Sequence, residues 1–363
     1  MKEIIKFSTG RRPKASHGYK QSAREGRLEY VTDALPGIVR IRRGKSFGFM
    51  INGKTVKNKE TLERIRQLVI PPAWDKVWIC PSENGHIQAT GYDVRNRKQY
   101  LYHAKWAALR NETKFYQLLE FGKALPLLRS RLKKDLREKE LNENKVLAIM
   151  ISLMEQTYIR VGNKSYEKLY GSYGLTTLKD KNVIVQGDKL EFSFKGKKGI
   201  SHKITLRNKK LAKAIKLCRD IPGKELFQYY DAEGEKKCID SGMLNNYLKE
   251  TTGKEFTAKD FRTWAGSYQA LKCLISMEET SDEAICKKNI LTTLDEVSKK
   301  LGNTRGICRK YYVHPVLIKL YEEKALDKFY SKINSSKCPK YLEPEEHLLL
   351  KILEKHAVNI NGN

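Results

Sequence analysis

The segment Leu301–Pro315 places two adjacent tyrosines, Tyr311 and Tyr312, directly after the basic residues Arg309 and Lys310. A phenol is a weak nucleophile unless neighbouring groups activate it, and surrounding cations are such groups. The chemistry that this segment could perform is therefore nucleophilic attack by a tyrosine oxygen. Paired aromatic residues on a helix also commonly fill a hydrophobic core, so the segment alone leaves both interpretations open.

Helix-boundary signals surround the two tyrosines. Gly302 follows an apolar helical pattern and can occupy the left-handed position after a helix without a Cβ clash. Thr304 can cap the next short helix, and Pro315 suits the first turn of another. The pattern predicts short helices packed around the tyrosines.

The N-terminal third of the chain is predicted to be a basic arm followed by a small, mainly β domain. Residues 1–30 combine basic and small polar residues, which is typical of a flexible arm. Alternating apolar residues begin at Ile38, and Asn52-Gly53 favours a hairpin turn that needs positive φ. These patterns place the β domain at residues 31–105.

The remainder, residues 106–363, is predicted to be a larger and mainly helical domain. Apolar residues recur at helical spacing over Phe115–Leu136, where Pro126 should divide the segment into two helices. The apolar pattern over Lys145–Ile159 predicts a buried helix, with Arg160 placed directly at its end. Three alternating runs between residues 183 and 206 predict a small antiparallel sheet, and helical signals resume from residue 209. The expected fold class is α+β.

The charge of the chain indicates a nucleic-acid partner. Its 363 residues include 71 Lys and Arg against 42 Asp and Glu, a formal net charge of +29 that is spread along the sequence. Such a charge opposes compaction unless a polyanion is bound. The 40 % of hydrophobic residues provides a sizeable core, which ribosomal and chromatin proteins of similar charge rarely need.

Other classes of protein are disfavoured. The chain has no run of about 18 apolar residues and no signal-peptide core, so no membrane association is expected. The seven cysteines are odd in number and form no CxxC pair, which disfavours zinc and disulfide scaffolds. No carboxylate cluster suited to Mg²⁺ is apparent. We expect an intracellular protein, cytoplasmic and nucleoid-associated, or located in the nucleus or virion if its source is eukaryotic or viral.

Five candidate site residues follow one another at separations of 37, 65, 41 and 9 residues, namely Arg160, Lys197, Arg262, Asn303 and Tyr312. This ordered set resembles the catalytic residues of type IB DNA topoisomerases, in the small form found in bacteria and poxviruses. Matching phrases occur in family order over about residues 30–320. They are Ile70–Trp74, Gly91–His103, Ile159–Asn163, Gly174–Leu178, Lys259–Thr263, Leu301–Thr304 and Arg309–Pro315.

The resemblance implies a covalent mechanism. Tyr312 would attack a DNA backbone phosphorus, forming a 3′-phosphotyrosine and releasing a 5′-hydroxyl. Arg160 and Arg262 would hold the non-bridging oxygens, because a forked guanidinium matches phosphate and keeps its charge. Asn303 would donate a third hydrogen bond as charge develops on those oxygens.

The resemblance also implies how the leaving oxygen is protonated. Lys197 would donate that proton, with Lys259 as a second member of the proton relay. Religation would reverse each step, so supercoiled duplex DNA would be relaxed with neither ATP nor a metal or other cofactor. Two departures bear on this reading, since poxvirus members have His in place of Asn303 and an acid in place of Lys198. We expect Tyr311 to be structural, filling the helix face opposite the nucleophile.

Further residues are implied to bind DNA. The family places a polar and aromatic strand of the N-terminal domain against the duplex, and further contacts come from residues that follow the first catalytic arginine. The predicted DNA-binding residues are Arg97, Lys98, Gln99, Tyr100, Tyr102, Asn163, Lys164 and Tyr166. The two domains of a monomer would then clamp around double-stranded DNA.

Two other functions fit parts of the sequence. A tyrosine site-specific recombinase would share the nucleophile and the arginines, but usually carries His-x-x-Arg where this chain has Lys259-x-x-Arg262. A non-catalytic DNA-binding or chromatin protein would explain the charge. Singly, each site residue also has a structural explanation: Arg160 can complement a helix end, and Asn303 can serve as a cap.

Overall fold

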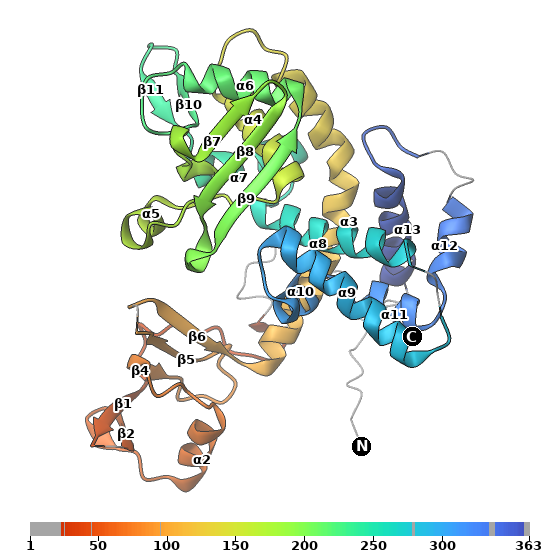
Figure 1. The fold of residues 1–363 in the computed structure, drawn as a ribbon. Helices are drawn as coiled ribbons and strands as arrows, with labels where there is room; N and C mark the ends of the chain where they lie inside the picture. Colours follow the sequence, from red (N-terminus) through yellow and green to blue (C-terminus); the bar gives the residue numbers. More distant parts are fainter. Residues whose placement is uncertain are drawn as a thin grey trace. The chain divides into compact units, whose positions relative to one another are not determined.

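The computed structural model describes residues 23–24, 26–44, 46–94, 96–277, 280–333 and 338–358 (Figure 1). The chain divides into two compact units, Met1–Phe115 and Tyr116–Asn363. Most of the predicted basic arm, residues 1–22 and 25, lies outside the described residues. Where the description begins, Ala23 and Leu28 are buried against Trp106. None of the described helices is both long and apolar enough to cross a membrane.

The first unit is built on one antiparallel six-stranded sheet with the strand order β3-β2-β1-β4-β5-β6. Its strands are β1 (Ile38–Arg43), β2 (Ser46–Ile51), β3 (Lys54–Thr55), β4 (Asp75–Ile79), β5 (Ile87–Tyr92) and β6 (Lys98–Tyr102). The predicted hairpin turn is confirmed, since Asn52 and Gly53 have φ of 48° and 75° between β2 and β3. Ile65, from the helix α2 (Lys59–Gln67), packs with Ile38 and Ile79 in the core.

The second unit is mainly helical, with a small antiparallel sheet of order β7-β8-β9 (Figure 1). These strands are β7 (Val183–Gln186), β8 (Lys189–Lys195) and β9 (Ser201–Arg207), and a second, two-stranded sheet joins β10 (Gln228–Tyr230) to β11 (Lys236–Cys238). The predicted α+β class and three-stranded sheet are therefore confirmed. The β10–β11 hairpin was not predicted, because helical signals dominate the residues around it.

The helices of the second unit enclose α4 (Glu143–Thr157), of which Val146–Met154 is fully buried. The others are α3 (Ala104–Asp135), α5 (Lys164–Tyr170), α6 (Lys209–Arg219), α7 (Ser241–Thr252), α8 (Ala258–Ile275), α9 (Glu283–Leu301), α10 (Arg305–Tyr311), α11 (Pro315–Glu322), α12 (Leu326–Ile333) and α13 (Pro344–Val358). Helix α3 begins within the first unit, at the predicted domain boundary.

The prediction that Pro126 divides its segment is wrong, because α3 continues through it. A proline inside a helix costs about 3 kcal/mol through a lost hydrogen bond and a clash with the preceding turn. Leu125 and Leu128, on either side of Pro126, are each 1 % exposed. Burial of such side chains contributes about 1.5–3 kcal/mol each, which is enough to hold the helix together.

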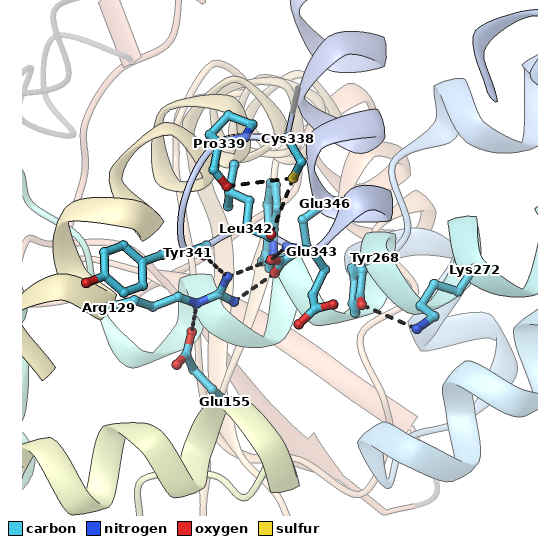
Figure 2. A network of polar contacts seen from close by, with 11 residues as sticks. Arg129, Glu155, Tyr268, Lys272, Cys338, Pro339, Tyr341, Leu342, Glu343 and Glu346 are labelled. Carbon is cyan, nitrogen blue, oxygen red and sulfur yellow. Dashed lines mark hydrogen bonds and ion pairs between the residues drawn. The ribbon is translucent and has the colours of Figure 1, made fainter. Parts of the chain in front are cut away.

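A buried polar network attaches the C-terminal helix to the rest of the second unit (Figure 2). Arg129 on α3 donates to both carboxylate oxygens of Glu346 on α13, at 2.6 and 2.8 Å, and to Glu155 on α4 at 3.0 Å. The indole of Trp264 on α8 donates to Glu346 at 3.0 Å. Despite burial, which would raise it, the pKa of Glu346 is lowered by Arg129. Helix α13, which lies in a segment without a recognisable motif, is thus part of the core.

Arg129→Ala should lower the free energy of unfolding of the second unit by about 3–5 kcal/mol, because it leaves a carboxylate buried without its cation. Lys287→Ala, which removes one partner of an ion pair whose side chains are 73 % and 88 % exposed, should cost less than about 1 kcal/mol. Urea denaturation followed by circular dichroism measures both. Equal costs for the two substitutions would contradict this role for Arg129.

Candidate active site

Arg160 follows α4 at a sharp change of chain direction. Tyr158 ends the helix in the left-handed conformation, with φ of 56°, so the helix stops before the predicted end at Ile159. The next residues pair with the Gly174–Leu178 segment, where Leu175 N–H donates to the carbonyl of Arg160 at 2.8 Å. A Cβ on Gly174 would lie 2.5 Å from that carbonyl oxygen, so only glycine permits this approach.

Arg262 lies in the first turns of α8 and is only 6 % exposed. Its guanidinium donates to the carbonyl of Tyr158, at the end of α4, and to that of Leu301, at the end of α9, the latter at 2.7 Å. Carbonyls at helix C-termini carry the negative end of the helix dipole, so two helix ends stabilise this buried cation. Burial nevertheless lowers its pKa, and Tyr312 partly opposes that effect.

Asn303 follows the turn that ends α9. Gly302 has φ of 56°, and Asn303 N–H donates to the carbonyl of Ser298 at 3.1 Å, as in a Schellman motif. The side-chain oxygen of Asn303 accepts from Arg160 Nη2 at 2.6 Å. The side chain therefore orients the arginine, while capping is carried out by the backbone.

Tyr312 ends α10 and is held by its backbone against the middle of α8. A Cβ on Gly266 would lie 2.6 Å from Cβ of Tyr312, and Ser267 Oγ donates to the Tyr312 carbonyl at 3.1 Å. The guanidinium carbon of Arg262 lies 5.4 Å from the centre of the Tyr312 ring. Tyr311 is 36 % exposed, so its ring is not buried in the core, and its structural role stays a prediction.

Lys197 lies at the tip of the β8–β9 hairpin, in the short 3-10 turn η3 (Lys197–Gly199). Its side chain is exposed, yet neighbouring atoms partly desolvate it, and this desolvation together with Arg160 lowers its pKa. Lys259, exposed on the first turn of α8, lowers it further. The charge of Tyr312 raises the pKa of Lys197. Lys197 therefore shares the electrostatic environment of the other candidate residues.

Arg160, Lys197 and Arg262 form a cationic cluster, and no carboxylate is among the charges that shift their pKa values. Burial, followed by the charge of Arg262, lowers the pKa of Arg160 to about 10. Two buried donors of this cluster, Arg262 Nε and Asn303 Nδ2, have no hydrogen-bond acceptor among the described residues. Like charges and unpaired donors both disfavour burial, so the arrangement suits a bound anion. No described group of three or more His, Cys, Asp or Glu side chains could hold a metal ion.

Comparison with known proteins gives the family. Residues 103–338 match the catalytic core of eukaryotic DNA topoisomerase I, and residues 47–93 match the N-terminal domain of bacterial DNA topoisomerase IB. DNA topoisomerase 1B of Acanthamoeba polyphaga mimivirus is 32 % identical over 297 residues, which cover 79 % of this chain and 88 % of the relative. The chain belongs to the type IB DNA topoisomerases. The vaccinia virus (strain Copenhagen) DNA topoisomerase 1B is 23 % identical over 240 residues, covering 64 % of this topoisomerase and 72 % of the viral protein.

This membership makes the chain an isomerase that acts on DNA. All six predicted catalytic residues of the topoisomerase fall within the matched catalytic core. Sequence reasoning missed the residues that contact them, among them Tyr158, Gly266 and Ser267. The only available signal was Gly266-Ser267, a small pair that begins one helical turn after Arg262.

The predicted DNA-binding residues of the first unit lie on or beside β6, the edge strand of its sheet. Tyr100 and Tyr102 are 43 % and 41 % exposed, and their rings stack with centres 5.9 Å apart. The other three are held by carboxylates: Arg97 and Gln99 contact Asp93, and Lys98 pairs with Asp33.

The predicted DNA-binding residues of the second unit lie at the start of α5. The side chain of Asn163 caps this helix by accepting from the N–H groups of Ser165 and Tyr166. Lys164 is exposed, Tyr166 is 55 % exposed, and α5 buries none of its residues. Contact of either set with DNA stays a prediction.

Gly266→Ala should slow DNA cleavage strongly, because the added Cβ would displace the Tyr312 backbone. A misplacement of about 1 Å can cost about 10²-fold in rate. Gly306→Ala is the matched control, since a Cβ there meets nothing within 4 Å and glycine is unfavourable in a helix. It should leave stability equal or higher, and single-turnover cleavage near wild type. Wild-type cleavage by Gly266→Ala would show that this contact does not position the tyrosine.

Proposed function

We propose that this topoisomerase relaxes supercoiled duplex DNA by nicking one strand, allowing rotation and religating the same strand. The observation that carries the proposal is the pair of buried donors, Arg262 Nε and Asn303 Nδ2, beside Arg160 and the Tyr312 ring. A phosphate supplies both the acceptors and the negative charge that this cluster needs.

In the cleavage step, the Tyr312 oxygen attacks the scissile phosphorus and gives its proton to solvent water. A phosphorus–oxygen bond to tyrosine forms while the bond to the 5′-oxygen breaks, leaving a 3′-phosphotyrosine. Arg160 and Arg262 neutralise the non-bridging oxygens, and Asn303 donates to them as their charge increases.

Lys197 protonates the departing 5′-oxygen, and Lys259 restores the proton on Lys197. The lowered pKa of Lys197 suits this role, because an acid with a pKa nearer neutrality transfers its proton more readily. Religation runs the same steps backwards from the 5′-hydroxyl.

One phosphodiester is exchanged for another, so no ATP is required. The positive charge that the phosphate needs comes from the two arginines and Lys197, so relaxation proceeds without a metal ion. We further propose that the protein acts as a monomer, with Tyr100 and Tyr102 of the first unit and the start of α5 in the second contacting opposite parts of the duplex. The family match favours this function over a recombinase and over a non-catalytic DNA-binding protein.

Relaxation of a supercoiled plasmid in EDTA, without ATP, tests the proposal. Tyr312→Phe should abolish relaxation and the covalent adduct while leaving DNA affinity nearly unchanged, because only one oxygen is removed. Tyr311→Phe, the adjacent control, should retain substantial activity. Peptide mapping of the trapped adduct to a residue other than Tyr312 would refute the assignment, and a strict need for metal would refute the metal-independent mechanism.

Lys197→Ala should slow cleavage by about 10²–10⁴-fold, the usual contribution of a general acid. Lys195→Ala removes the same charge from the exposed end of β8 and should remain near wild type. DNA with sulfur in place of the 5′-bridging oxygen releases a thiolate that needs no proton, so it should restore cleavage by Lys197→Ala. In the wild type, cleavage of normal DNA should decline as pH rises through the lowered pKa of Lys197, whereas cleavage of the sulfur substrate should not. If Lys197→Ala cleaves the sulfur substrate as slowly as it cleaves normal DNA, the general acid is a residue other than Lys197.

A further inference from the structure

His202 on β9 contacts two glycines that each precede a proposed catalytic residue. A Cβ on Gly196 would lie 2.6 Å from Cδ2 of the imidazole, and a Cβ on Gly302 would lie 2.6 Å from its Cε1. One edge of the ring therefore faces the glycine before Lys197, and another faces the glycine before Asn303. On β8, the cross-strand partner Phe194 stacks against the ring, with centres 5.1 Å apart and planes at 19°.

The two glycines are explained by this ring. Gly196 has φ of −93°, which any residue can adopt, so its backbone conformation does not call for glycine. Its lack of a side chain matters because the imidazole occupies the space that a Cβ would need. Gly302 has φ of +56°, so the helix end and the ring both require glycine there.

The imidazole makes these contacts as a neutral group. Burial, followed by the charges of Arg160 and Arg262, lowers the pKa of His202, so the ring is uncharged at neutral pH. Among the described residues its nitrogens make no hydrogen bond; its contact with Phe194 is through a ring face. It also lines the same cavity as Arg160 and Lys197.

We infer that His202 is a positioning residue that acts as a spacer between the Lys197 hairpin and the Asn303 turn. The hairpin comes from the three-stranded sheet and the turn from the end of α9, so no continuous chain sets their separation. The ring sets it by contacting both backbones. This inference rests on the proposed function, in which the proton donor and the Asn303 amide must meet the same phosphate.

Single-turnover cleavage tests the inference with three variants. His202→Ala should cleave about 10–100-fold more slowly with unchanged DNA affinity, because small displacements of catalytic groups have effects of this size. His202→Phe keeps a flat ring and should recover most of the rate. Leu206→Ala, on the same face of β9 but in contact with neither glycine, is the control and should remain near wild type. Equal rates for His202→Ala and Leu206→Ala would overturn the inference.

Two comparisons separate positioning from a general loss of structure. DNA with sulfur at the 5′-bridging position should restore part of the His202→Ala rate, since Lys197 is then no longer needed. Gly196→Ala should be defective alone but add little to His202→Ala, because the ring that it collides with is gone. The spacer role would be contradicted if the sulfur substrate left the slow cleavage by His202→Ala unchanged. It would also be contradicted if the rate losses of Gly196→Ala and His202→Ala multiplied in the double variant.

A measurement without DNA keeps this inference separate from the proposed function. The backbone N–H of Gly199 donates to the carbonyl of Gly196 at 3.0 Å, and the backbone N–H of Asn303 donates to that of Ser298 at 3.1 Å. His202→Ala should speed hydrogen exchange at both amides, and Leu206→Ala at neither. A wild-type protein that forms no covalent adduct would overturn the proposed function, while unchanged exchange in His202→Ala would overturn the spacer.

Discussion

The burial of the Arg262 guanidinium is the constraint on which the site depends. A buried cation is costly unless it is compensated, and here the compensation comes from carbonyls at the C-terminal ends of α4 and α9. Those two helix ends carry Arg160 and Asn303 in the residues that follow. The same two hydrogen bonds that stabilise Arg262 therefore bring the other proposed phosphate-binding groups to it, and its Nε has no acceptor among the described residues.

Carbonyl compensation differs from the way this chain stabilises the half-buried Arg129. Arg129 is paired with two carboxylates, Glu155 and Glu346, and the result is a neutralised network that joins α13 to the core. Carboxylates around Arg262 would cancel the charge that a phosphate requires. Carbonyls carry only partial charge, so they orient the guanidinium and leave most of its attraction for an anion. The second unit thus separates the groups that stabilise it from those proposed to bind the DNA phosphate.

Close backbone approach is the second device that assembles the site. Gly174 and Gly266 each lie where a Cβ would come within 2.6 Å of the backbone of a neighbouring segment. At Gly174 the neighbour carries Arg160, and at Gly266 it is the backbone of Tyr312 itself. Backbone contacts leave less freedom than contacts between long side chains, so they suit groups that must align with one phosphorus atom.

Local patterns determined much of this protein from the sequence alone. The Asn52-Gly53 hairpin and the helix end at Gly302 depend on neighbouring residues, so they could be predicted. The charge indicated a nucleic-acid partner, and residue types in order indicated the family. The contact between Arg160 and Asn303, 143 residues apart, was decided only by the tertiary structure, as was the path of α3 through Pro126. A guanidinium can take many partners, and a proline's cost is outweighed only by burial, so both outcomes depend on packing between distant segments.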